Sequence, residues 1–340
     1  MGMGKRAGIT TTIPVEVILA AGLVPVDLNN IFVVSPDAGG LLGKAHQRGF
    51  AQNLCAWIKG IYQAAMDEGI KRVVGVTRGD CSSTEKLLEI WRSDGVETVP
   101  FAYPAVPDAE LMAAEISRFA RSLGTDLVEA EKWRERLAPI RKLLSELDRL
   151  TWEEGIVTGA ENHLWLVSSS DFGGDPEKFE DDLRAFVDEV KKRRPASEGI
   201  RLAYLGVPPI VNDLYDFIEG RGARVVLNEV QRQFSMPGDH AGLAEQYSAF
   251  TYPYDTFGRI EDVKEEIARR NIHGVVHYAQ TFCHRQMESI LFSEKLPVPV
   301  LVVEADVPGP LDARTRTRIE AFIEQLSEQQ NRADVGNTAR

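Results

Sequence analysis

The sequence has few cysteines, no long apolar run and no excess of positive charge. Its 340 residues include three cysteines, an odd number that argues against a framework of disulfide bonds. The longest nearly uncharged apolar run, residues 17–26, is far shorter than the roughly 20 residues that a membrane crossing needs. Lys and Arg number 39 and Asp and Glu number 51, and the resulting net charge of −12 argues against nucleic acid as a partner. The polar N-terminus has no apolar signal core, which predicts a cytoplasmic protein.

Common nucleotide and catalytic motifs are also missing. No Gly-x-Gly-x-x-Gly follows an expected strand, which argues against a standard dinucleotide site, and no Gly-x-Ser-x-Gly is present. Residues 39–44 (GGLLGK) match a phosphate-binding loop only in part, because that motif needs glycine at Ala38 and a hydroxyl residue at Ala45. We therefore expect this chain not to hydrolyse ATP by itself.

The sequence does show a regular alternation of short apolar runs and amphipathic stretches. This alternation predicts an α/β protein with two doubly wound parallel-sheet domains, of Rossmann or flavodoxin type, around a central cleft. We expect an N-terminal α/β domain over 1–150, a helical connecting segment over 151–198 and a four-stranded domain over 199–340. The expected strands are 72–77, 97–103, 202–207, 224–228, 274–278 and 298–304, and the expected helices are 51–68, 82–91, 108–123, 176–192, 210–219, 259–270, 283–292 and 313–326.

The segment 129–150 has a different character, because it is dense in Glu and Arg and has one apolar face. Trp133, Leu137, Ile140, Leu144 and Leu147 follow a heptad-like spacing, which predicts a helix with this face buried. The face either packs within its own domain or forms a contact between two copies of the chain.

Two of the three cysteines occupy equivalent positions in the two halves of the sequence. Cys81 and Cys283 each follow an expected strand by a short loop and precede an expected helix. That position is the carboxyl edge of a parallel sheet, where α/β proteins bind ligands, and a helix N-terminus stabilises a thiolate. Cys55 lies on the helix expected over 51–68, at the edge of its buried face. The alternative is that each is an ordinary buried thiol, since free cysteine is among the most buried residue types.

If the three cysteines converge on the cleft, they offer three thiolates with a fourth position open. Such a set suits a [4Fe–4S] cluster that leaves one iron free for substrate or water. Structural zinc fits less well, because no Cys-x-x-Cys pair is present and only His284 lies beside a cysteine.

Several short segments spread over nearly the whole chain carry a resemblance to a known family. They are Pro14-Val15-Glu16, Ala20-Ala21-Gly22-Leu23-Val24-Pro25, Cys55, Gly79-Asp80-Cys81, Thr281-Phe282-Cys283, residues 301–306 (LVVEAD) and residues 316–322 (RTRIEAF). Together they resemble the 2-hydroxyacyl-CoA dehydratase and benzoyl-CoA reductase family of iron–sulfur proteins.

The resemblance implies that Cys55, Cys81 and Cys283 hold a [4Fe–4S] cluster between two α/β domains. It further implies an ATP-dependent iron–sulfur activator protein that supplies a low-potential electron, so that water leaves a 2-hydroxyacyl-CoA through a ketyl radical. Glu16 matches the acidic residue of the N-terminal motif and would move protons as a catalytic residue. Alternatively, Glu16 is an acid favoured at a helix N-terminus after Pro14.

The resemblance leaves three functions open. The chain is compact for a dehydratase subunit, which would pair with a homologous chain as a heterodimer. Compact relatives also include homodimers with a double-cubane [8Fe–9S] cluster that reduce small molecules, and the same cysteines would serve them. A two-lobed small-molecule binding protein is the alternative from another class, because fold alone does not decide function.

Overall fold

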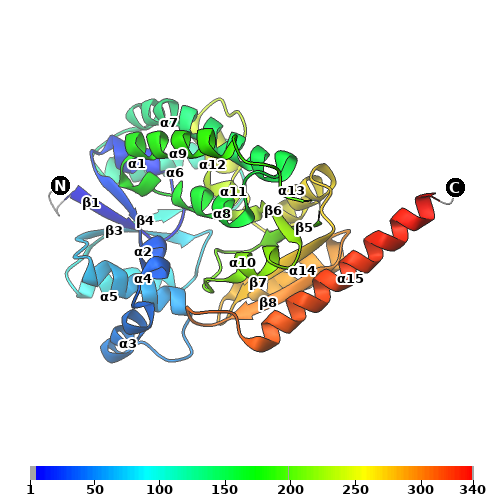
Figure 1. Ribbon diagram of the computed structural model, residues 1–340. Helices are drawn as coiled ribbons and strands as arrows, with labels where there is room; N and C mark the ends of the chain where they lie inside the picture. The colour runs from blue at the N-terminus through cyan, green and yellow to red at the C-terminus, as the bar shows by residue number, and fades with distance from the viewer. Residues whose placement is uncertain (1–4, 198, 339–340) are drawn as a thin grey trace.

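The computed structural model describes residues 5–197 and 199–338 and contains two parallel β-sheets (Figure 1). The first sheet consists of β1 (Arg6–Ile9), β2 (Val24–Asp27), β3 (Arg72–Arg78) and β4 (Glu97–Ala102), and the second of β5 (Ile200–Leu205), β6 (Ala223–Asn228), β7 (Gly274–Gln280) and β8 (Val300–Ala305). All of their pairings are parallel. The predicted fold class, α/β with two doubly wound parallel sheets, is confirmed.

The two sheets share one topology. Their strand orders are β2-β1-β3-β4 and β6-β5-β7-β8, so the winding reverses between β1 and β3 and again between β5 and β7. A reversal of this kind separates the two loops that leave neighbouring strands, and it opens a crevice at the carboxyl ends of those strands. Each sheet therefore offers one such crevice.

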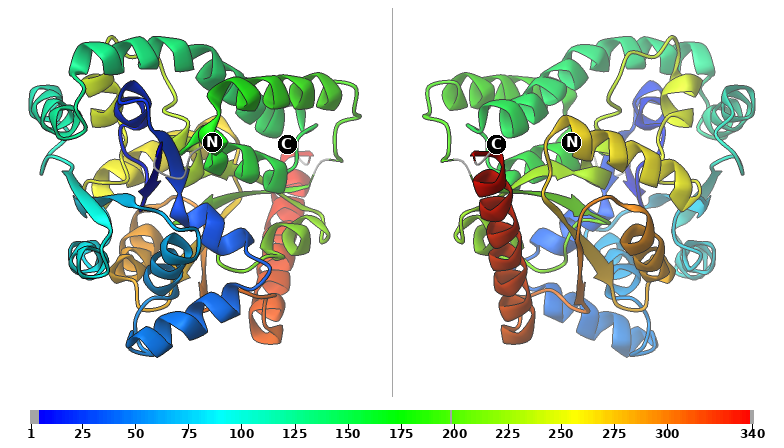
Figure 2. Two further views of the ribbon diagram at one scale, coloured as in Figure 1. Left: turned by 90° about the vertical axis from the view of Figure 1, so that its left-hand side faces the viewer. Right: turned by 90° about the vertical axis from the view of Figure 1, so that its right-hand side faces the viewer.

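Helices connect the strands and cover both sheets (Figures 1 and 2). The first half contains α1 (Val15–Ala20), α2 (Leu28–Val34), α3 (Ala38–Arg48), α4 (Ala56–Asp67), α5 (Thr84–Ser93), α6 (Ala109–Ser122) and α7 (Leu127–Arg149). The remainder contains α8 (Gly159–Ser168), α9 (Pro176–Val190), α10 (Leu214–Glu219), α11 (Glu229–Phe234), α12 (Leu243–Ser248), α13 (Thr256–Arg269), α14 (Glu288–Lys295) and α15 (Ala313–Thr338). Carboxylate and hydroxyl caps fix several starts. Asp126, for example, accepts a hydrogen bond from the Glu129 amide at the start of α7.

The expected strands all lie within two residues of their observed bounds, but β1 and β2 were not expected. Each has only four residues, too few to show a periodicity, and β2 lies within a longer apolar stretch that contains Pro25. The helix expected over 51–68 begins only at Ala56, because the backbone turns over 51–54 and Cys55 is its extended N-cap. The helix expected from Cys283 begins as a 3₁₀ turn, η4 (His284–Met287), before α14.

Residues 151–197 are largely helical and contact both halves of the chain. It contains a π-helical turn, η2 (Leu150–Glu154), then α8, a 3₁₀ turn η3 (Phe172–Gly174), and α9. Helix α8 packs on β6 and α11, whereas η3 packs on β2 and α9 packs on α7. The expected domain limits at residues 1, 198 and 340 lie outside the described residues, and the division of the chain at 150 and 198 stays a prediction.

The apolar face of α7 is buried within its own chain. Leu137, Ile140, Leu144 and Leu147 form one core cluster with residues of α1, α8 and α9, and Trp133 packs at its edge. Of the two alternatives for this face, packing within its own chain is therefore the correct one. The cluster joins α8 and α9 to α1 and α7.

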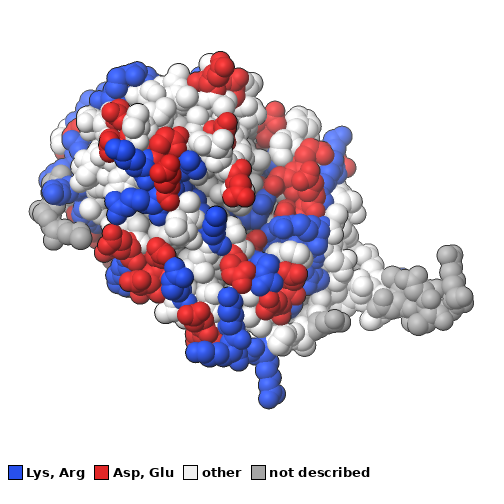
Figure 3. Space-filling view, turned by 90° about the horizontal axis from the view of Figure 1, so that it is seen from above, with Lys and Arg blue, Asp and Glu red and all other residues white. Residues whose placement is uncertain are grey.

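The surface above α7 carries charges of both signs. In Figure 3 basic and acidic side chains are interspersed. Several ion pairs lie along single helices, for example those of Lys132 with Glu129 and of Arg184 with Glu180. No helix within the described part of the chain has the length and apolar character needed to cross a membrane.

Removal of a side chain from the α7 cluster should destabilise the monomer. We expect Leu144→Ala to lower the free energy of unfolding by about 2–4 kcal/mol, because the side chain is fully buried and a cavity would remain. Leu164→Ala, which truncates a side chain that is 57% exposed, is the matched control and should change little. Urea unfolding at two protein concentrations provides the test. If the decrease in the free energy of unfolding depends on protein concentration, the face would instead form a contact between two copies of the chain.

Candidate active site between the two sheets

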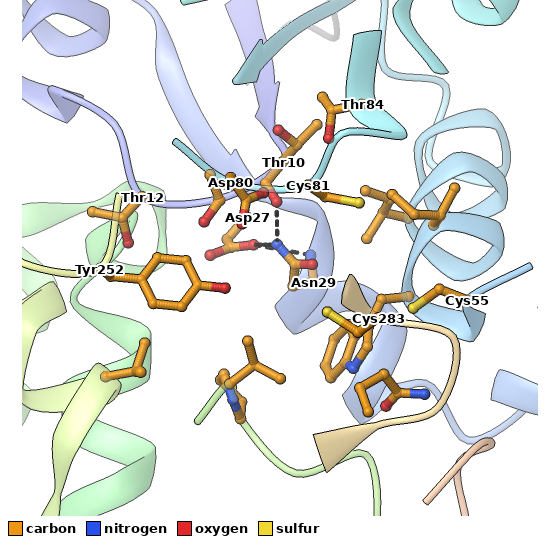
Figure 4. A pocket seen from close by; sticks show the side chains of 18 of the residues that line it. Thr10, Thr12, Asp27, Asn29, Cys55, Asp80, Cys81, Thr84, Tyr252 and Cys283 are labelled. Atoms are coloured by element: carbon orange, nitrogen blue, oxygen red, sulfur yellow. Dashed lines mark hydrogen bonds between the residues drawn. The ribbon is translucent and has the colours of Figure 1, made fainter. Parts of the chain in front are cut away.

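The crevices of the two sheets face each other and form one cavity (Figure 4). Its space, including the part continuous with solvent, is about 810 Å³. The lining residues come from the loops after β1, β3 and β5, from the ends of β2 and β7, and from helices α2, α4, α8 and α11 with the loop after α12. They are Thr10, Thr11, Thr12, Asp27, Asn29, Asn30, Cys55, Trp57, Ile58, Ile61, Asp80, Cys81, Thr84, Val167, Val207, Pro208, Val230, Phe234, Tyr252, Gln280 and Cys283. The expected cleft is therefore present where both topologies place a ligand.

All three cysteines line this cavity as free thiols. Cys55 is the N-cap of α4, Cys81 lies in the turn before α5, and Cys283 is the N-cap of η4. Figure 4 shows the three side chains around one side of the cavity, with Thr12 and Tyr252 on the opposite side. The convergence inferred from the spacing of the cysteines thus agrees with the structure.

Both cysteine loops after the central strands contain a residue in the left-handed region. Gly79, two residues before Cys81, has φ of 101°, and Phe282, immediately before Cys283, has φ of 64°. A non-glycine residue rarely adopts such a conformation, and it persists only where the surroundings impose it. These two bends direct the following thiols into the cavity.

Arg285 connects the two cysteine loops. Its Nη2 donates to the carbonyl oxygens of Gly79, at 3.2 Å, and Tyr252, at 3.0 Å, while its Nη1 pairs with Glu288 at 2.9 Å. Glu288 also pairs with Arg259, which in turn forms a bidentate pair with Glu229. A continuous chain of buried and half-buried charges therefore holds the loop of Cys283 against the loop of Cys81.

Burial keeps the thiols protonated in the absence of a bound cation. Removal from water raises the pKa of Cys55 to about 12 and that of Cys81 to about 11, and it also raises the pKa of Cys283. Backbone amides at the helix starts act in the opposite direction, for example those of Trp57 and Ile58 at Cys55. The expected stabilisation of thiolates by helix N-termini is thus present, but desolvation outweighs it.

The described residues contain no group of three His, Cys, Asp or Glu side chains arranged to hold a single metal ion. A cubane does not need that arrangement, since each thiolate binds a different iron. The cavity wall also has buried polar atoms without a hydrogen-bond partner, namely Thr12 Oγ1, Thr84 Oγ1 and Trp57 Nε1. A buried polar atom without a hydrogen bond lowers the stability of the fold unless a bound group in the cavity forms a hydrogen bond with it. Three soft thiols together with unpaired donors fit an iron–sulfur cluster and a polar ligand beside it.

The polar side of the cavity could not be recognised in the sequence. Thr10, Thr12 and Asp27 follow or end the two strands that were not expected, so their positions could not be recognised. Asn29 donates its side-chain amide to the Thr10 carbonyl and to Asp27, both at 2.9 Å, and joins the two segments. The only signal was the run of three threonines directly after Ala7-Gly8-Ile9.

Two carboxyl groups share a buried position at this polar side. Asp171 accepts a hydrogen bond from the Asp27 amide at 2.6 Å, and Asp27 accepts one from the Ser170 hydroxyl at 2.6 Å. Burial, and next the negative charge of Asp27, raise the pKa of Asp171 to about 7, and burial also raises the pKa of Asp27. The pair therefore retains a proton under conditions in which separate carboxyl groups would have lost it.

Asp80 is the second carboxyl group in the cavity wall. It lies between Gly79 and Cys81, and the Tyr252 hydroxyl bonds to it. Its pKa is raised because burial outweighs the opposing effect of the nearby Arg285 charge. In the sequence, Asp80 stands out only as part of the Gly79-Asp80-Cys81 motif.

Glu16 does not reach the cavity. Its side chain is fully buried, pairs with Arg141 at 2.6 Å and accepts hydrogen bonds from Gln246 and Tyr247. These contacts join α1 to α7 and α12, and Glu16 lies in the first turn of α1, which matches the alternative of an acid at a helix start. Of the four residues predicted for the site, the structure thus brings together the three cysteines and leaves Glu16 outside.

Fold and site together define a two-lobed α/β protein with a thiol-lined cavity between its sheets. The chain belongs to the 2-hydroxyglutaryl-CoA dehydratase, D-component, family, whose model matches residues 10–326. The predicted relationship to the 2-hydroxyacyl-CoA dehydratases is therefore confirmed, and the family is that of a component of a dehydratase. No curated protein matches the chain.

The bend at Gly79 provides a test of how the cysteine loops are held. A Cβ at Gly79 would lie 2.8 Å from Pro253 Cβ and 2.9 Å from Tyr103 Cβ, whereas a Cβ at Gly95, also at positive φ, would meet nothing within 4 Å. We expect Gly79→Ala to lower the free energy of unfolding by about 1–3 kcal/mol more than Gly95→Ala does. Urea denaturation of both variants measures this difference, and equal losses would contradict it.

The Asp27–Asp171 pair predicts a pH dependence of stability. The usual carboxyl pKa is 3.8, so the folded state holds a proton between pH 4 and about 7 that the unfolded chain has released. The free energy of unfolding should therefore fall as the pH rises through this window. Asp27→Asn removes one charge and should reduce that fall by about 1 kcal/mol. Asp181→Asn, at an exposed carboxylate, is the control, and an unchanged slope in Asp27→Asn would show that the pair does not share a proton.

Proposed function

We propose that this chain is a subunit of an iron–sulfur enzyme that removes water from a 2-hydroxyacyl-CoA, with Cys55, Cys81 and Cys283 as ligands of a [4Fe–4S] cluster. The observation that carries the proposal is the convergence of all three cysteines of the chain on one cavity between the two sheets. Membership of a dehydratase family supports the reaction class. When bound, the cluster would supply a Lewis-acidic iron without a cysteine ligand and a site for a low-potential electron.

The protein's own side chains would bind and orient the substrate. The unpaired hydroxyls of Thr12 and Thr84 can complete hydrogen bonds to the hydroxyacyl group, and Val207, Val230 and Phe234 exclude water on the other side. Asp27 lines the cavity and contacts Asp171, so this pair is placed to accept and return a proton during elimination. Glu16, with its oxygens committed to Arg141, Gln246 and Tyr247, has no part in this proposal.

The elimination is neutral in overall redox terms, since a C–O and a C–H bond break, a C=C bond forms and water leaves. The starting electron must come from outside the chain, and we propose an ATP-dependent iron–sulfur activator as its source. The family is that of one component of a dehydratase, which fits a partner subunit. A homodimer and a heterodimer with a homologous chain are both compatible with the site, because the cavity is built from the two sheets of one chain.

The proposal is tested by anaerobic reconstitution with iron and sulfide, followed by assay with reduced activator, ATP and a 2-hydroxyacyl-CoA. Formation of the unsaturated acyl-CoA is the expected result. Reduction of a small unsaturated molecule without any CoA ester would instead identify a double-cubane [8Fe–9S] reductase. Tight binding of a small ligand without turnover or bound iron would identify a binding protein.

Replacement of any one ligand should abolish both the cluster and the turnover. We expect Cys55→Ser, Cys81→Ser and Cys283→Ser each to retain only a small fraction of the iron and sulfide bound by the unaltered protein, because a cubane that loses a thiolate is lost or altered. Ser82→Ala, beside Cys81 and exposed, is the control and should bind the full amount. Iron and acid-labile sulfide analysis measures the outcome, and a fully loaded, active Cys81→Ser protein would contradict the proposed ligand set.

A further inference from the structure

The cavity between the sheets contains no cationic side chain. Among the described residues that line it, the ionisable groups other than the thiols and Tyr252 are the carboxyls of Asp27 and Asp80. The remaining lining is apolar or neutral: an apolar wall that includes Val167, Val207 and Val230, and hydroxyl and amide groups on the polar side. The charge available to a ligand from this wall is therefore negative or zero.

The nearest cations on the neighbouring elements have their terminal nitrogens bound elsewhere. Lys59 lies on α4 among residues that line the cavity, but its Nζ donates to the Gln52 carbonyl at 3.0 Å. Arg285 follows Cys283, and its two terminal nitrogens bond to Glu288 and to the Gly79 and Tyr252 carbonyls, while its Nε has no partner. Neither side chain lines the cavity. A second anionic group on the substrate would find no partner of opposite charge there.

The lack of a cationic side chain in the cavity wall favours a neutral acyl chain over one that ends in a carboxylate. A carboxylate that leaves water without a cation carries a large desolvation penalty, which neutral donors such as the Thr12 and Thr84 hydroxyls offset only in part, and two nearby carboxyls add repulsion. A neutral aliphatic or aromatic chain would instead lose only its contact with water and gain the apolar wall. The Thr12 and Thr84 hydroxyls, 3% and 1% exposed and without partners, are suited to a hydroxyl group.

We propose that the substrate of this chain is a 2-hydroxyacyl-CoA whose acyl chain has no second carboxylate. The inference rests on the proposed function and narrows its substrate class. It also separates this chain from the glutaryl group in the name of its family, because that group carries a second carboxylate.

The test compares two esters that differ only at the end of the acyl chain. In 2-hydroxy-5-methylhexanoyl-CoA an isopropyl group replaces the carboxylate of 2-hydroxyglutaryl-CoA, and the CoA portion is the same. Dissociation constants are measured anaerobically by calorimetry on the reconstituted protein, without activator or ATP, so that turnover does not contribute. We expect the neutral ester to bind at least about tenfold more tightly.

A substitution in the apolar wall provides an independent test. Val207 lies in the loop after β5, is partly exposed and lines the cavity, so a longer side chain can be accommodated there. Val207→Lys supplies the missing cation and should narrow or reverse the preference for the neutral ester. Val207→Met adds a side chain of similar length without charge and should keep the preference.

The outcomes separate the substrate class from the function. Equal affinities, or tighter binding of 2-hydroxyglutaryl-CoA to the unaltered protein, would overturn the inference and leave the dehydratase function standing. A natively folded Val207→Lys protein with an unchanged preference would also overturn it. Binding of neither ester would contradict the proposed function itself, and the inference with it.

Discussion

The geometry of the cavity depends on the contact between two loops that come from different sheets. Arg285 makes this contact, since one guanidinium group bonds to the backbone before Cys81 and to the acid of its own helical segment. The series of ion pairs continues from Glu288 to Arg259 and from Arg259 to Glu229. The Glu229 carboxylate also accepts a hydrogen bond from the backbone amide of Gly206, directly after β5. Buried ion pairs add little net stability, because desolvation offsets their attraction. Their effect here is positional, as they fix the loops of two parallel sheets at one separation.

Once these loops are fixed, the chemistry of the thiols follows from their burial. A thiol removed from water holds its proton more strongly, as the raised pKa values of Cys55 and Cys81 show. Metal binding requires thiolates, so binding of the cluster would release the thiol protons. The binding free energy of the cluster would have to offset the cost of that deprotonation. The protonated thiols are therefore poor nucleophiles and are slow to oxidise or to be alkylated, but as thiolates they remain suitable ligands for a soft metal centre.

The positions of Cys81 and Cys283 could be predicted because each follows a valine-rich strand by a short loop, a pattern that is visible in a single sequence. Cys55 could be placed only near the site, since its helix starts later than its apolar periodicity suggests and the turn before it has no strong signal. Thr10, Thr12 and Asp27 could not be predicted, because β1 and β2 are too short for periodicity and the strand order that makes them neighbours of β3 depends on the whole fold. For Glu16 the sequence left two alternatives, a catalytic acid and an acid at a helix start. Only the structure shows that Arg141, distant in sequence, pairs with its carboxylate.

The central claim is that three cysteines of one chain hold a four-iron cluster with one iron left for the substrate. Mössbauer spectroscopy of the protein reconstituted with ⁵⁷Fe tests it most directly, because it resolves irons with different ligands. One iron in four should give a distinct spectrum, and binding of a 2-hydroxyacyl-CoA should alter the spectrum of that iron alone. Four indistinguishable irons, or iron that never assembles into a cluster, would contradict it.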